Sequence, residues 1–210
     1  VPLMIGGAVG TTAFVTTDRR STGTQMADNV MEQRINYEIS QAIKTGLHLN
    51  VTCYNGRVLL TGQVANEQDK QVAQKIAQRS LEVRSVINEL YVGPETSLGQ
   101  RMADSTLASK VRSYLVGTKN ISLNQMKVTV ENGTVYLMGL VTAQEAQTAA
   151  NVASRVSGVK SVVKVFEVIS EQEVERRLSL LNQHNSQQPK EEPLTTNNLT
   201  DSSSTEVRLQ

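Results

Sequence analysis

The sequence predicts an α+β fold built from two tandem α-β-β-α-β modules, each a small mixed sheet packed by two helices. An internal repeat supports this prediction, because three blocks recur in the same order at offsets of 76 or 77 residues: 28–36 with 104–112, 53–65 with 130–142, and 83–92 with 159–168. Each copy also contains an Asn-Gly pair between alternating apolar residues, which predicts a β-hairpin. The two copies are therefore expected to share one architecture.

The repeat and the composition divide the 210 residues into six expected segments. These are a flexible N-terminal tether (1–26), a first module (27–93), a linker (94–102), a second module (103–169), a short helix (170–181) and a disordered tail (182–210). The apolar stretch at residues 1–17 is shorter than the roughly 20 residues that a membrane-spanning helix needs, so we read it as a tether. The tail is rich in Gln, Asn, Ser, Thr, Pro and Glu, a composition typical of disorder.

Apolar residues at helical spacing predict the first helix of each module. They are Val30, Met31, Ile35, Ile39, Ala42 and Ile43 in the first copy, and Leu107, Val111, Tyr114 and Leu115 in the second. Asp28 and Asp104 precede these stripes and are predicted to be N-caps. Ala-rich second helices are expected at about 66–80 and 143–156. Because modules of this size have thin cores, we also expect the two copies to pack against each other.

Five glycines are predicted to serve the fold and not a ligand: Gly56, Gly62, Gly133, Gly139 and Gly158. Gly56 and Gly133 complete the Asn-Gly turns, in which a type I′ geometry requires positive φ at both positions. Gly62 and Gly139 interrupt the second strand of each hairpin, which indicates a bulge or the close approach of another backbone.

The residues needed for catalysis or metal binding are not apparent in the sequence. Cys53 is alone and is predicted to be a small buried hydrophobe on a strand. His48 and His184 lack neighbouring ligand or triad patterns, so we predict no enzyme activity, no metal site and no cofactor. A hydrolase would become plausible only if His48 lay in a pocket beside a carboxylate. A net charge of +1 and the scarcity of aromatic residues argue against a nucleic-acid partner.

The hairpin region carries a resemblance to the BON-domain family. The pattern V-x-x-x-N-G-x-V-x-L-x-G-x-V spans Val51 to Val64 and recurs from Val128 to Val141, where it is followed by Gly158-Val159-Lys160-Ser161-Val162. The first copy has Glu82 where the second has Gly158, so we expect its helix-to-strand turn to be built differently.

The segment from Thr17 to Gln25 resembles the stretch that follows the lipidated cysteine in dual-BON outer-membrane lipoproteins of Gram-negative bacteria. This resemblance implies an exported protein that faces the periplasm, anchored by lipid to the outer membrane. It also implies a role in envelope integrity and in binding anionic phospholipid. The sequence has no cysteine near residue 1, so we expect the anchor to precede Val1.

Charge distinguishes the two modules. The first has seven basic and seven acidic residues, the second has seven basic and four acidic, and the segment from residue 170 has four basic and seven acidic. A basic surface favours an anionic membrane, so we place a candidate lipid-binding surface on the first helix of the second module, at Leu107, Lys110, Arg112 and Tyr114. Two alternatives remain open: an ordinary solvated helix face, or an adaptor that docks through its first module on another periplasmic or outer-membrane protein.

Overall fold

The computed structural model describes residues 17–187 and shows two modules of the same architecture. The first contains α1 (Thr22–Ala42), β1 (His48–Tyr54), β2 (Arg57–Val64), α2 (Glu67–Arg79), β3 (Ser85–Asn88) and β4 (Tyr91–Val92). The second contains α3 (Leu98–Val116), the 3-10 turn η1 (Leu123–Gln125), β5 (Met126–Glu131), β6 (Thr134–Val141), α4 (Ala143–Ser154), β7 (Ser161–Lys164) and β8 (Glu167–Val168). A further helix, α5 (Glu171–Gln187), follows. The predicted α+β class and tandem arrangement are confirmed.

The second strand of the hairpin is the central strand of each module's sheet. β2 pairs antiparallel with β1 and parallel with both β3 and β4, and β6 pairs in the same way with β5, β7 and β8. β1 and β5 therefore form the edges of their sheets. The helices of each module cover one face of its sheet, and a core of aliphatic side chains lies between them.

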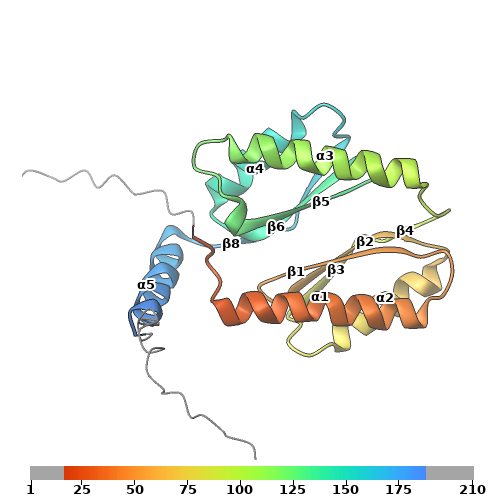
Figure 1. Ribbon diagram of the computed structural model, residues 1–210, viewed down its shortest axis with the longest axis horizontal. Coiled ribbons are helices and arrows are strands. Elements are labelled where there is room, and N and C mark those ends of the chain that lie inside the picture. Colours follow the sequence, from red (N-terminus) through yellow and green to blue (C-terminus); the bar gives the residue numbers. More distant parts are fainter. Residues whose placement is uncertain (1–16, 188–210) are drawn as a thin grey trace, which may run out of the picture.

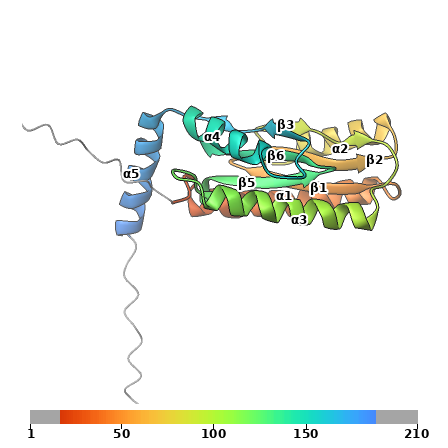
Figure 2. The same cartoon turned by 90° about the horizontal axis from the view of Figure 1, so that it is seen from above.

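The two modules pack with their sheets facing each other, so the molecule has four layers: helices, sheet, sheet, helices (Figures 1 and 2). A third apolar cluster fills the space between the sheets, where Tyr54 and Leu59 of the first module meet Tyr136, Met138 and Leu140 of the second. The expected packing of one copy against the other is confirmed. Burial between the sheets raises the pKa of Tyr136 to about 12.

The helices extend beyond their predicted bounds. α1 begins at Thr22 with Ser21 as its N-cap, inside the segment predicted to be a tether, and α3 begins at Leu98 with Ser97 as its N-cap, inside the predicted linker. α5 continues to Gln187, beyond the predicted end at residue 181. Most of the predicted tether and tail, residues 1–16 and 188–210, lies outside the described residues.

Asp28 and Asp104 are not N-caps, because each lies more than one turn inside its helix and is buried. The carboxylate of Asp28 accepts the backbone N–H groups of Asn55 and Gly56, at 2.7 and 2.9 Å. Sequence position alone suggested a cap because a short acidic side chain before an apolar stripe is typical of one. The structure instead uses this side chain to tie the helix to the hairpin turn.

The apolar stripes are partly as predicted. Most of their members are buried, but Val30, Ala42 and Tyr114 face solvent, so the prediction is wrong for these three. Periodicity cannot separate a side chain at the edge of a helical stripe from one in its centre.

The structural glycines lie where the backbone is tightly constrained. Gly56 and Gly133 have φ of 73° and 80°, and the asparagine before each also has positive φ. A Cβ added at Gly62 would lie 2.0 Å from the carbonyl oxygen of His48, and one added at Gly139 would lie 2.2 Å from that of Gln125. The neighbouring backbone therefore leaves no room for a side chain at either position.

Gly158 has a φ of 102°, and Glu82 at the matching position of the first module has a φ of 69°. The prediction that the first module builds this turn differently is wrong. Both modules use a left-handed residue there, and the first does so with a glutamate despite the steric cost to a residue with a Cβ.

Candidate lipid-binding surface and inter-module groove

The four residues predicted to contact lipid do not form one surface on α3. Leu107 is buried in the core of the second module, whereas Lys110 and Tyr114 are exposed. Arg112 is also exposed, but its guanidinium turns toward β5, where it donates to the carbonyl oxygen of Val128 at 2.7 Å. At about 100° per residue, Arg112 lies roughly 200° around the helix from Lys110, on the opposite flank.

A different set of α3 residues forms the outer surface. Leu98, Met102 and Val116 lie along one face of the helix and are 73%, 63% and 65% exposed. Exposed hydroxyl residues, Thr106, Ser109 and Ser113, occupy the same side between them. This outer stripe of α3 (Leu98, Met102, Thr106, Ser109, Ser113 and Val116) was missed because the repeat alignment began near residue 103. The spacing of Leu98 and Met102 after Ser97 was the available signal for an earlier helix start.

The first helices of the two modules differ in charge. Within Leu98–Val116, which the structure describes throughout, three basic residues accompany one acidic residue, and that residue, Asp104, is buried. Within Thr22–Ala42 the ratio is reversed, with one basic and three acidic residues. The outer face of α3 therefore combines exposed apolar side chains with positive charge.

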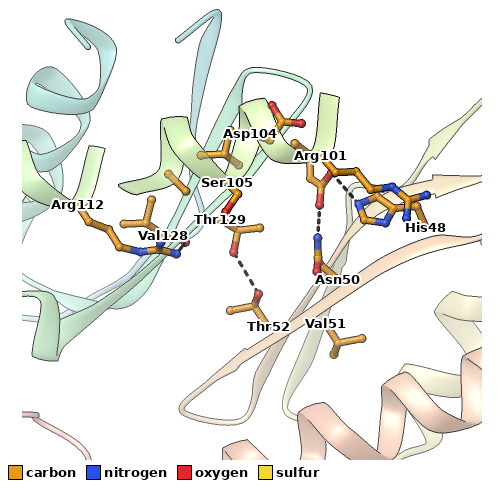
Figure 3. Close-up of a pocket in the computed structure, with 13 residues that line it drawn as sticks. His48, Asn50, Val51, Thr52, Arg101, Asp104, Ser105, Arg112, Val128 and Thr129 are labelled. Atoms are coloured by element: carbon orange, nitrogen blue, oxygen red, sulfur yellow. Dashed lines mark hydrogen bonds and ion pairs between the residues drawn. The ribbon is translucent and has the colours of Figure 1, made fainter. Parts of the chain in front are cut away.

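A groove separates α1 and α3 along the side of the molecule where the edge strands β1 and β5 meet (Figure 3). One cavity of about 310 Å³ and another of about 450 Å³ share Val51, Thr52, Arg112, Val128 and Thr129, so they are continuous. Two side chains cap the edge strands here. The carboxylate of Glu32 accepts a hydrogen bond from the backbone N–H of Cys53 at 2.7 Å. The guanidinium of Arg112 donates a hydrogen bond to the backbone carbonyl of Val128.

His48 lies in this groove with its Nε2 3.5 Å from a carboxylate oxygen of Glu131, which also accepts a hydrogen bond from Asn50 (Figure 3). Burial raises the pKa of Glu131, and the bonds from Asn50 and His48 counter part of that effect. A hydrolase was considered plausible only if His48 lay in a pocket beside a carboxylate, and the structure meets this geometric condition. A triad also needs a hydroxyl held against the imidazole. Of the hydroxyl residues that line this cavity, Thr52 and Thr129 bond to each other at 3.2 Å, and in the described structure Ser105 makes no bond to His48.

Outside this groove, the described part of the chain does not bring reactive side chains together into a site. Cys53 is fully buried, and burial raises the pKa of its thiol well above its usual value. Within residues 17–187, no three His, Cys, Asp or Glu side chains gather closely enough to hold a metal ion. In the same range no helix is both long and apolar enough to cross a membrane.

A family model of the BON domain matches residues 27–94 and 103–170. The chain belongs to the BON-domain family. It is 42% identical over 166 residues to the outer membrane lipoprotein DolP of Haemophilus influenzae, covering 78% of this chain and 85% of that protein. It is 35% identical over 154 residues to a 21 kDa hemolysin of Actinobacillus pleuropneumoniae, covering 72% and 79% respectively. These findings confirm the resemblance to dual-BON outer-membrane lipoproteins.

Among solved structures, the C-terminal domain of CdsD, a structural protein of the type III secretion system of Chlamydia trachomatis, matches with 15% identity and a TM-score of 0.29. The match covers 66% of this chain and 96% of that one. At this TM-score the likeness carries no argument about fold or function.

Proposed function

We propose that this protein is a non-catalytic envelope protein held at the periplasmic face of the outer membrane, and that its second module binds anionic phospholipid through the outer stripe of α3. The 42% identity to an outer membrane lipoprotein supports the location. The observation that carries the lipid proposal is the composition of α3, where the exposed apolar side chains of the outer stripe are flanked by the exposed Lys110 and Arg112 and the one acidic side chain, Asp104, is buried.

The chemistry of the stripe suits the boundary between lipid headgroups and acyl chains. Leu98, Met102 and Val116 can enter the apolar layer. The hydroxyls of Thr106 and Ser109 between them donate to carbonyls of their own helix, which lowers the cost of moving them out of water. Arg101 is paired with Glu95 at 2.7 Å. Arg112 is exposed and keeps its charge, because the Val128 carbonyl that it bonds is neutral, but this bond holds its guanidinium toward β5. The exposed Lys110 and Lys119 are therefore the lysines that can turn toward anionic lipid.

Two such lysines contribute about 2 kcal/mol at low salt, roughly a thirtyfold preference for anionic over neutral vesicles. Binding of this strength is weak and sensitive to salt, and is most useful to a protein already held at the membrane by an acyl chain.

Vesicle flotation tests the proposal. Full-length protein is mixed with neutral phosphatidylcholine vesicles or with vesicles containing phosphatidylglycerol, at low and high salt. We expect recovery with anionic vesicles at low salt only, and a strong loss in the Lys110→Glu variant. Lys44→Glu is the matched control, because Lys44 is also exposed but follows α1 in the first module. Equal recovery with both vesicle types, or equal loss in both variants, would reject the role of α3.

A second candidate function is an adaptor that binds another envelope protein through the first module. An exposed apolar stripe on α1 favours it, because Met26, Val30 and Tyr37 lie on one face and are 64%, 58% and 66% exposed. The acidic character of α1 makes this stripe a poor match for anionic lipid. If it is a docking surface, Val30→Asp abolishes capture of an envelope protein and leaves vesicle flotation unchanged.

A further inference from the structure

The short segment before α1 lies at the boundary between the two modules. Figure 1 shows it (red) leaving α1 and rising from the helix layer of the first module toward the second. Arg19 and Arg20 in this segment are 5% and 9% exposed, although arginine is rarely so buried without a specific partner. Both have carboxylate partners, and those partners belong to different modules.

Arg19 binds the second module. Its guanidinium makes a bidentate ion pair with Glu145 at 2.7 and 2.8 Å and also donates to the carbonyl oxygen of Leu140 at 3.0 Å. Glu145 belongs to the capping box of α4, in which it accepts the backbone N–H of Thr142. Burial alone would raise the pKa of Glu145, but the bonds from Arg19 and Thr142 lower it below its usual value. Arg19 is therefore bound to the N-terminal end of α4 through Glu145.

Arg20 binds the first module. It pairs with Asp28 at 2.7 Å, and that carboxylate also holds the Asn55-Gly56 turn. Its guanidinium carbon lies 3.7 Å from the centre of the Tyr54 ring, within the range of a cation–π interaction. Asp18 completes the arrangement by accepting hydrogen bonds from Arg20 and from the hydroxyl of Tyr54.

We propose that Asp18, Arg19 and Arg20 form an inter-module clasp that holds the two modules in one orientation. Adjacent residues reach the start of α4 in one module and the hairpin turn of the other, so both bonds can be made only when the modules are docked. The residues upstream of Thr17 join the described chain at this boundary. A mechanical force applied to the upstream residues would therefore be transmitted to Arg19 and Arg20, which bond to both modules.

The clasp is not the sole link between the modules. The apolar cluster between the sheets and the ion pair of Arg84 with Glu167 at 3.1 Å also join them. Removing one partner of the Arg19–Glu145 pair nevertheless leaves the other charge unpaired where little water can reach it, since the two side chains are 5% and 13% exposed, and this is unfavourable. Loss of Arg19 is therefore expected to loosen the docked arrangement while each module keeps its own core. This inference does not depend on lipid binding.

The test compares how the modules tumble in the full 210-residue chain, using ¹⁵N relaxation. In the wild type both modules should share one rotational correlation time. Arg19→Gln and Glu145→Gln should each shorten the correlation times and make them differ between modules, with little further change in the double variant. Arg19→Lys keeps the charge but loses the bidentate geometry. Its correlation times should lie between those of the wild type and those of Arg19→Gln.

Arg176→Gln is the control, since it removes an arginine–carboxylate pair that is exposed on α5. It should tumble like the wild type. The proposal is overturned if the Arg19 and Glu145 variants also tumble as one body with wild-type chemical shifts between the sheets. It is equally overturned if the effects of the two substitutions simply add, because the two residues would then not act as one pair.

Discussion

The carboxylate of Asp104 accepts the backbone N–H of Gly133 at 2.9 Å, and its other oxygen accepts that of Asn132 at 2.8 Å. The first module repeats this arrangement with Asp28 and its own Asn-Gly turn. In each module, a buried aspartate in the first helix thus fixes the hairpin against that helix. A type I′ turn points both N–H groups toward one side, and a carboxylate can satisfy both at once.

Asp104→Ala should destabilise the protein by about 2 kcal/mol, because it leaves the buried N–H of Gly133 and the partly buried N–H of Asn132 without their carboxylate partner. Denaturant unfolding of the full chain measures this loss. Glu175→Ala, which removes an exposed carboxylate from α5, should change the free energy of unfolding very little. A loss below about 1 kcal/mol for Asp104→Ala would show that water or another group replaces the carboxylate.

Gly139→Ala should cost about 3 kcal/mol of stability, since the added methyl group would overlap the backbone of Gln125 and Met126. Gly117→Ala serves as the comparison, because its Cβ would make ordinary contacts at 3.6 Å or more. Thermal unfolding of both variants should give a large fall in Tm for the first alone. Similar Tm values for the two would contradict the close approach of β5 to β6.

Glu82→Gly should stabilise the protein by about 1 kcal/mol, because glycine adopts a φ of 69° without the steric cost that a Cβ imposes. The reciprocal change in the second module, Gly158→Ala, should destabilise it, since φ there is 102°. Chemical denaturation of both variants measures whether the free energy of unfolding rises for Glu82→Gly and falls for Gly158→Ala. Stabilisation by both, or by neither, would mean that backbone strain does not govern this turn.

The buried carboxylate of Glu131 should make stability depend on pH. Burial raises its pKa in the folded protein, so ionisation costs stability above that pKa and the cost disappears as pH falls through it. Glu131→Gln should therefore raise the free energy of unfolding at pH 7.5, by an amount that shrinks toward about pH 4. Measuring both proteins in a His48→Gln background removes the neighbouring imidazole from the comparison. An advantage of the variant that grows on acidification would contradict this account.

The repeat in the sequence was sufficient to predict the architecture, because the Asn-Gly turns, the strand glycines and most of the apolar stripes depend on local geometry. The roles of Asp28 and Asp104 could not be read in the same way. An aspartate before an apolar stripe is typical of an N-cap, and only the folded structure shows that the helix starts earlier and that the carboxylate reaches a turn distant in sequence.

The candidate site was harder to predict because it depends on which flank of a helix is covered. Lys110 and Arg112 are two residues apart and both are exposed, yet they lie on opposite flanks of the helix and only Arg112 bonds to β5. The clasp was missed for a similar reason. Arg19 and Arg20 lie in a stretch without helical or strand periodicity, and their partners, Glu145 and Asp28, are set by the docking of the two modules.

Met26 and Met102 offer the most direct test of lipid binding by the second module. They occupy matching positions in the repeat, on α1 and α3, and are 64% and 63% exposed, so an aspartate should affect folding equally at either position. Flotation with vesicles that contain phosphatidylglycerol, at low salt, compares Met102→Asp with Met26→Asp. We predict that the α3 variant loses vesicle binding and that the α1 variant keeps it. Equal binding by the two variants, or loss with Met26→Asp alone, would contradict the assignment of the lipid surface to α3.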